Sequence, residues 1–149
     1  MDGAPFDQLV CADRRCATLL PADAELCDEC GGTDLRPLHD AEAVLVGLDR
    51  ARATAYRLAG SSVIVGRSAP DSQPDVDVSR LEGAESVHRR HASVERTAEG
   101  WQATHLGRNP LVRQRGAEAT PVAPGDSIEL RSGDGLVVGL VRLRFYSSG

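Results

Sequence analysis

Short runs of apolar residues, either alternating with polar ones or rich in Val, Ile and Leu, follow one another along most of the chain. Such runs predict β-strands, because successive side chains of a strand point to opposite faces of a sheet. The runs are residues 43–48, 54–59, 62–67, 91–97, 101–106, 111–115, 127–132 and 136–146. No segment keeps a helical period between two caps. The pattern therefore predicts a mainly β protein in which about eight short strands form a β-sandwich.

The first forty residues follow a different pattern. All four cysteines lie there, at Cys11, Cys16, Cys27 and Cys30. The segment GGTDLRPLHDAEA after them is rich in turn residues and has no period. A chain of 149 residues has room for one ordinary domain and a small additional unit. We therefore expect a small unit over residues 1–38 and a larger β-domain over residues 39–149.

The cysteines form two short pairs, Cys-x4-Cys and Cys-x2-Cys, separated by ten residues. Two cysteine-bearing turns joined by a hairpin supply the four thiolates of a tetrahedral zinc site. In a reducing compartment this arrangement favours a metal over disulfides, which three pairings would allow. The unit resembles a zinc ribbon, although its first spacing is wider than the usual two residues. Four thiolates complete the coordination shell, so we expect a closed structural Zn²⁺ site, with His39 left as a linker residue.

The charge of the chain limits its partners. The formal net charge is −5 and the pI is near 5.3, so the molecule as a whole repels a phosphate backbone. All 17 basic residues are arginine, which a GC-rich bacterial genome explains. The first ten residues lack a signal-peptide pattern, and no apolar run is long enough for a membrane span. These features predict a cytoplasmic bacterial protein that binds neither a membrane nor nucleic acid.

Four segments of the β-domain carry a series of motifs: VIVGR, VHRRHASV, WQATHLGRN and PGDSIEL, in that order. Their order and spacing resemble those of forkhead-associated (FHA) domains, whose signature is Gly-Arg, then Ser-x-x-His, then Asn-Gly in successive loops. Gly66 and Arg67 match the first motif, His91 the end of the second and Asn109 the start of the third. The resemblance extends from Ala43 nearly to the C-terminus. It implies a β-sandwich that reads phosphothreonine through loops at one end.

The resemblance also implies roles for individual residues. Arg67 would be the guanidinium that holds the phosphate, which carries about two negative charges near neutral pH. Asn109 would hold the peptide backbone beside the phosphothreonine, and His91 would support the binding loop by hydrogen bonding. Arg89 and Arg108 flank these positions and are further candidate phosphate contacts.

Some positions depart from the FHA pattern. His88 stands where the family has a serine that donates to the phosphate, and Gly107 stands where a hydroxyl residue is common. Ser86 lies two residues upstream, roughly 6–7 Å along an extended loop, which is too far to replace that serine. Two interpretations stay open: His88 and nearby arginines form an alternative, pH-sensitive grip, or the site is degenerate. The candidate phosphopeptide residues are Arg67, His88, Arg89, Arg108 and Asn109, with Gly66 and His91 as structural support.

No nucleophile-elbow motif accompanies Ser86 or His88, and two histidines three residues apart on a loop point in different directions. We therefore expect neither enzyme activity nor a metal site there. The acidic loop at residues 71–82 lacks the glycine of a calcium loop and predicts a solvated turn.

The sequence favours a non-enzymatic adaptor that binds a Thr-phosphorylated protein or peptide in serine/threonine kinase signalling, with a kinase or its substrate as partner. One alternative is a degenerate FHA scaffold that binds an unphosphorylated partner. Another is a zinc-ribbon regulator associated with the transcription machinery. Direct DNA contact is disfavoured, because residues 11–36 contain no aromatic side chain to stack on bases.

Overall fold

The computed structural model describes residues 4–13, 15–49 and 53–148, which contain three β-sheets and one short 3₁₀ helix. The sheet orders are β2-β1-β3, β11-β10-β13-β14-β4-β5 and β12-β9-β8-β6-β7. The elements are β1 (Leu9–Cys11), β2 (Leu19–Leu20), β3 (Leu35–Pro37), β4 (Ala43–Leu48), β5 (Ala53–Arg57), β6 (Ser62–Gly66), β7 (Val76–Asp77), η1 (Ala84–Ser86), β8 (Ala92–Thr97), β9 (Gly100–His105), β10 (Leu111–Arg115), β11 (Glu118–Pro121), β12 (Ser127–Leu130), β13 (Gly135–Val138) and β14 (Val141–Ser147). None of the described helical residues forms a helix long and apolar enough to cross a membrane.

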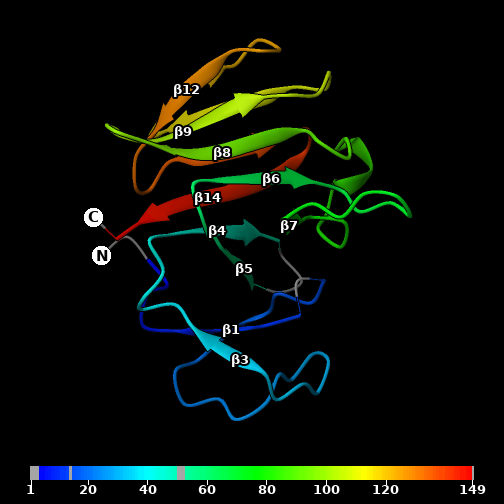
Figure 1. The fold of residues 1–149 in the computed structure, drawn as a ribbon, viewed down its shortest axis with the longest axis vertical. Helices are drawn as coiled ribbons and strands as arrows, with labels where there is room; N and C mark the ends of the chain where they lie inside the picture. The colour runs from blue at the N-terminus through cyan, green and yellow to red at the C-terminus, as the bar shows by residue number, and fades with distance from the viewer. Residues whose placement is uncertain (1–3, 14, 50–52, 149) are drawn as a thin grey trace.

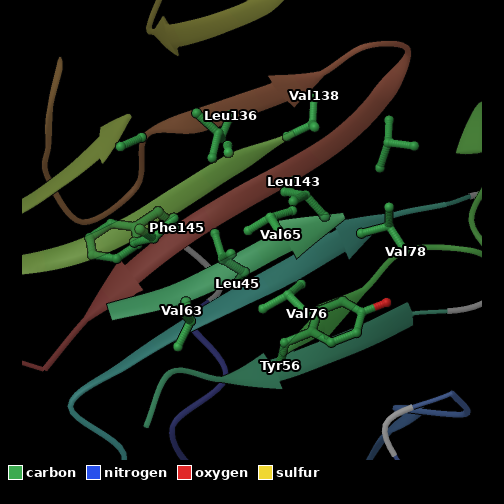
Figure 2. Packing of buried hydrophobic residues seen from close by; sticks show 14 of the residues in the cluster. Leu45, Tyr56, Val63, Val65, Val76, Val78, Leu136, Val138, Leu143 and Phe145 are labelled. Carbon is green, nitrogen blue, oxygen red and sulfur yellow. The ribbon is translucent and has the colours of Figure 1, made fainter. Parts of the chain in front are cut away.

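The two larger sheets pack face to face and enclose the main hydrophobic core (Figures 1 and 2). Leu45, Val65 and Phe145 come from β4, β6 and β14 and are completely buried between the sheets (Figure 2). Trp101 on β9 is 8% exposed and packs near Phe145, with ring centroids 5.8 Å apart. The prediction of a mainly β sandwich is confirmed, and Trp101 belongs to its core.

One predicted strand is divided in two. The run at residues 136–146 forms β13 and β14, which pair as an antiparallel hairpin. Gly139 in the turn between them has a φ of +60°, a conformation that glycine adopts without strain. Apolar residues on both sides of this turn conceal it in the sequence. The short strands β7 and β11 are not predicted by the apolar pattern.

The small cysteine-bearing sheet packs against the sandwich at β5, where it lies along the lower part of Figure 1. The backbone N–H of Ala55 donates to the carbonyl of Ala17 at 2.9 Å, and Thr18 forms an isolated bridge with Thr54. A second apolar cluster spans the contact and contains Val10, Leu38, Ala41, Val44 and Ala55. The cysteine unit therefore joins the sandwich through both backbone hydrogen bonding and apolar packing.

Three loops gather at the end of the sandwich toward which β6 runs in Figure 1. They follow β6, precede β8 and connect β9 to β10. Arg67 N donates to the carbonyl of His88 at 3.2 Å, which joins the first loop to the second. Leu106 N donates to the carbonyl of His91 at 2.9 Å, which joins the third to the second. The loop end therefore brings the three FHA-like motifs together.

Candidate functional site

The four cysteines meet in the small N-terminal unit. Their Sγ atoms all lie within 4.8 Å of one another, and the Cys11–Cys30 and Cys16–Cys27 pairs are each separated by 3.6 Å. A disulfide needs about 2.05 Å between sulfurs, so these distances describe four separate thiols. A zinc ion bonded to four thiolates at about 2.3 Å places the sulfurs about 3.8 Å apart. The cluster therefore has the dimensions of a tetrahedral site that could hold a metal.

Backbone amides around the cluster also favour metal binding. Three of the sulfurs each accept a hydrogen bond from the backbone of the residue two positions later, at Asp13, Thr18 and Gly32. Burial raises the pKa of Cys11 to about 12. At Cys16 burial also acts to raise the pKa, but hydrogen bonds from Thr18 outweigh it and bring the pKa down to about 7. Four thiolates this close repel one another, and a divalent cation would remove that repulsion.

Arg67 directly follows β6 and is exposed at the loop end of the sandwich. Its Nε donates to the carbonyl of Val87 at 3.1 Å, which fixes the guanidinium beside the second loop. Gly66 passes so close to this loop that a Cβ there would lie 2.0 Å from the carbonyl oxygen of Arg89. Glycine at position 66 therefore permits the close approach that places Arg67 next to His88 and Arg89.

His91 is completely buried and connects the second loop to the third. Its Nδ1 accepts the backbone N–H of His88 at 3.2 Å, so the ring hydrogen resides on Nε2. Nε2 donates to the carbonyls of Asn109 at 2.9 Å and Pro110 at 3.1 Å. Burial lowers the pKa of His91, and these two carbonyl contacts oppose that effect only in part. The ring is thus a neutral internal connection between the two loops.

The third loop is held from other directions as well. His105 is buried at the end of β9 and stacks on His91, with ring centroids 5.7 Å apart. Its Nε2 lies 2.8 Å from the carbonyl of Asn109, and its Nδ1 lies 2.7 Å from the carbonyl of Val122. The side-chain Nδ2 of Asn109 donates to the carbonyl of Ser86 at 2.7 Å. These bonds tie the third loop to β9 and η1.

His88 and Gly107, two departures from the FHA pattern, are in contact. A Cβ at position 107 would lie 2.8 Å from Cδ2 of His88, so the ring fills the space that a side chain there would need. The two departures therefore compensate each other, because the larger residue in the second loop requires the smallest one in the third. Nε2 of His88 is buried and has no hydrogen-bond partner in the part of the chain that the structure describes.

The other predicted contacts are arginines on the surface. Arg89 Nη1 donates to both carboxylate oxygens of Asp71, at 3.0 and 3.2 Å. Both side chains are more than half exposed, so water screens this ion pair and an incoming anion can displace the carboxylate. Arg108 lies exposed on the third loop beside Gly107. The loop end thus presents the guanidinium groups of Arg67, Arg89 and Arg108.

Ser86 is engaged within the fold. Its Oγ donates to the carbonyl of Gly83 at 2.6 Å and accepts the backbone N–H of Leu140 at 2.7 Å. The hydroxyl therefore holds η1 against the turn between β13 and β14. Both the donor and the acceptor function of this hydroxyl are thus used within the fold.

Sequence reasoning missed a hydrogen-bonded group next to Arg67. Asp77 is buried, and its Oδ1 accepts the hydroxyl and the backbone N–H of Ser79 at 2.5 and 3.0 Å. The Oγ of Ser79 accepts the backbone N–H of Ser68 at 2.9 Å. The prediction of a solvated turn over residues 71–82 is therefore wrong at Asp77, whose carboxylate anchors the loop after β6. The spacing Asp-x-Ser, typical of an Asx turn, is the sequence signal that could have indicated it.

No protein-family model matches the sequence, and no curated protein matches it. Solved structures do match the fold. The FHA domain of CT664 from Chlamydia trachomatis has a TM-score of 0.55 and 20% identity, covering 72% of this chain and 98% of its own. The FhaA FHA domain, solved with the intracellular domain of Rv3910, has a TM-score of 0.53 and 20% identity, covering 69% and 98%.

The FHA domain of human APLF, solved with an XRCC1 bisphospho peptide, has a TM-score of 0.51 and 19% identity, covering 69% of this chain and 97% of its own. Each match covers nearly the whole of the other domain. The larger part of this chain therefore has the FHA fold, as the motif resemblance predicts.

Proposed function

We propose that this chain, an FHA-type sandwich with a four-cysteine unit packed beside it, is a non-enzymatic adaptor that binds phosphothreonine in a partner protein. The observation that carries the proposal is Arg67, exposed at the loop end with its guanidinium fixed by the bond to Val87. A guanidinium is suited to bidentate binding of phosphate. One matching structure is described as part of a study of phosphothreonine-dependent FHA domain interactions, which supports this ligand class.

The proposed grip differs from the FHA pattern at its second loop. Arg67, Arg89 and Arg108 supply the positive charge, and the phosphate displaces Asp71 from Arg89. His88 replaces the usual serine, and its unpartnered Nε2 gains a phosphate oxygen when the ring turns outward from Gly107. Asn109 holds the peptide backbone at the third loop.

The four-cysteine unit completes the proposal as a structural element over residues 1–38, followed by the FHA domain over residues 39–149. Cys11, Cys16, Cys27 and Cys30 would hold Zn²⁺, which their spacing of 3.6–4.8 Å fits. A four-thiolate shell leaves no open coordination position, so the ion would supply folding energy only. Cysteine thiols persist in a reducing compartment, so we place the protein in the cytoplasm, where a serine/threonine kinase would phosphorylate its partner.

Titration with a set of phosphothreonine peptides tests the proposal. Fluorescence anisotropy should detect binding of at least one phosphorylated peptide and no binding of its unphosphorylated form. Arg67→Ala should weaken binding at least tenfold, because charged hydrogen bonds to the phosphate are lost. Arg144→Ala is the matched control, since this exposed arginine lies on β14 and outside the loops. Equal binding of phosphorylated and unphosphorylated peptides would support the degenerate scaffold instead, and unchanged binding by Arg67→Ala would refute the proposed site.

A further inference from the structure

A polar hollow of about 170 Å³ lies at Ser68, the residue after Arg67, and is lined from both the cysteine unit and the sandwich. Arg15, Ser68, Asp77, Ser79 and Arg80 line it. Arg15 belongs to the first cysteine pair, between Cys11 and Cys16, whereas the other four belong to the loop after β6 and to the end of β7 and beyond. The hollow therefore lies where the cysteine unit meets the sandwich.

The two arginines of the hollow share it with the carboxylate of Asp77 but form no ion pair with it. Both side chains are exposed, and neither forms an ion pair with any residue that the structure describes. Other arginines of the chain do pair, for example Arg57 with Asp40 at 3.1 Å and Arg96 with Glu42. Two unpaired guanidinium groups at one hollow repel each other, and an anion between them would relieve that repulsion.

The remaining lining residues provide a fixed floor. The hydroxyl of Ser79 donates to Asp77, so its oxygen serves as the acceptor for the backbone N–H of Ser68. The hydroxyl of Ser68, 3.0 Å from that same oxygen, is then the donor of the pair and can turn toward a ligand. Asp77 opposes an anion by its charge, but it is 5% exposed and its Oδ1 is already occupied by these donors. The lining therefore combines one movable hydroxyl donor with two guanidinium groups that have no ion-pair partner among the described residues.

We propose that this hollow is a second anion subsite, which takes a second phosphorylated or carboxylate side chain of the peptide whose phosphothreonine lies at Arg67. Ser68 follows Arg67 directly in the chain. One peptide can therefore place its phosphothreonine at Arg67 and a nearby acidic residue in the hollow. The inference rests on the proposed phosphothreonine binding and adds to it the acidic class of the peptide. It also gives the cysteine unit a part in recognition, because the cysteine ligands on both sides position Arg15.

Peptides with one and with two acidic groups test this subsite on the intact, metal-loaded chain. Starting from the best phosphothreonine peptide, phosphoserine or glutamate is placed in turn at each position within four residues of the phosphothreonine. At one position the second group should tighten binding about tenfold, because two charged hydrogen bonds are added. A gain with phosphoserine alone assigns the subsite to a phosphate, and a gain with both assigns it to acidic side chains in general.

Variants then locate the gain. Arg15→Ala and Arg80→Ala should each lower the ratio of the two affinities from about ten toward one. Arg36→Ala is the matched control on the cysteine unit, since Arg36 pairs with Asp34 at 3.1 Å, and it should keep the ratio. Metal content is measured for every variant to show that the unit remains folded.

Two results would overturn the inference. One is that no position of the second acidic group tightens binding more than twofold, and the other is that the gain persists in both Arg15→Ala and Arg80→Ala. If peptides with a single phosphothreonine also fail to bind, the proposed function fails with it. If they bind normally, the proposed function stands and only the second subsite is refuted.

Discussion

The substitution His91→Leu should remove the internal connection between the second and third loops. In the native chain the ring accepts the N–H of His88 and donates to the carbonyls of Asn109 and Pro110. Leucine fills much of the same buried space but has no polar atom. The carbonyl of Asn109 keeps its contact with His105, and that of Pro110 keeps the backbone N–H of Gly139 at 2.9 Å. The N–H of His88 alone is left without a partner.

The expected loss of stability is the sum of the costs at the N–H of His88 and at the carbonyls of Asn109 and Pro110. A buried N–H without a partner costs about 1–3 kcal/mol, and each of the two weakened carbonyl contacts costs about 0.5 kcal/mol. His91→Leu should therefore lower the free energy of unfolding by about 2–4 kcal/mol. His91→Gln is the matched variant, because its amide can accept from His88 and donate to Asn109. It should recover about half of the loss.

The pH dependence provides an independent readout. Burial lowers the pKa of folded His91 below its ordinary value of 6.5, so the unfolded chain takes up this proton at higher pH than the folded one. Its contribution to stability is complete above about pH 6.5 and is lost as the pH falls through the lower folded pKa. Both variants lack this titration. The native chain should therefore lose more stability than either variant when the pH falls from about 7.5 to about 5, across the ordinary histidine pKa of about 6.5.

Urea denaturation at the two pH values measures these effects. Trp101 is the one tryptophan of the sequence and lies in the core, so its fluorescence reports global unfolding. A His91→Leu variant within about 0.5 kcal/mol of the native chain at pH 7.5 would contradict the assigned hydrogen bonds. Equal pH slopes for the native chain and both variants would contradict the burial of a neutral ring.

Three further predictions concern the rest of the fold. Chelation, or Cys27→Ser, should remove one zinc per chain and unfold the cysteine unit, as metal analysis and circular dichroism would show; full metal content in Cys27→Ser argues against the site. Gly66→Ala should lower stability by at least about 2 kcal/mol in thermal melts, because its Cβ meets the carbonyl of Arg89; a native melting temperature would disprove that contact. Arg115→Met should cost about 3 kcal/mol at pH 7, because it leaves buried Asp134 without its two charged hydrogen bonds. Adding Asp134→Asn should restore part of that loss, and no restoration would refute the assignment.

The sequence predicts the bounds of a strand well where a turn residue directly follows the apolar run. The ranges 43–48 and 111–115 coincide with β4 and β10, because charged or turn residues border each of these runs on both sides. The sequence does not separate β13 from β14, since apolar residues continue on both sides of Gly139. It also misses β7, a parallel strand of two residues whose pairing with β6 depends on the loop before it.

The candidate site likewise contains residues that local motifs identify and contacts that only the tertiary structure reveals. Arg67 and His91 are found from short motifs, and the structure places them at one end of the sandwich. The contact of His88 with Gly107 joins residues far apart in the chain, so it depends on how two loops meet. The placement of Arg15 beside Arg80 depends on the docking of one unit on another, which no local pattern encodes.

The contact between the cysteine unit and β5 has a consequence for solubility. β5 ends the six-stranded sheet, and such an end strand has unpaired backbone groups that can recruit a strand of another molecule. Residues 17 and 18 occupy part of that edge through the bonds at Ala55 and Thr54. Because two of the cysteines, Cys16 and Cys27, enclose this segment, the metal they are proposed to bind would also keep the edge covered. Metal depletion would then favour aggregation through β5 as well as unfolding of the cysteine unit.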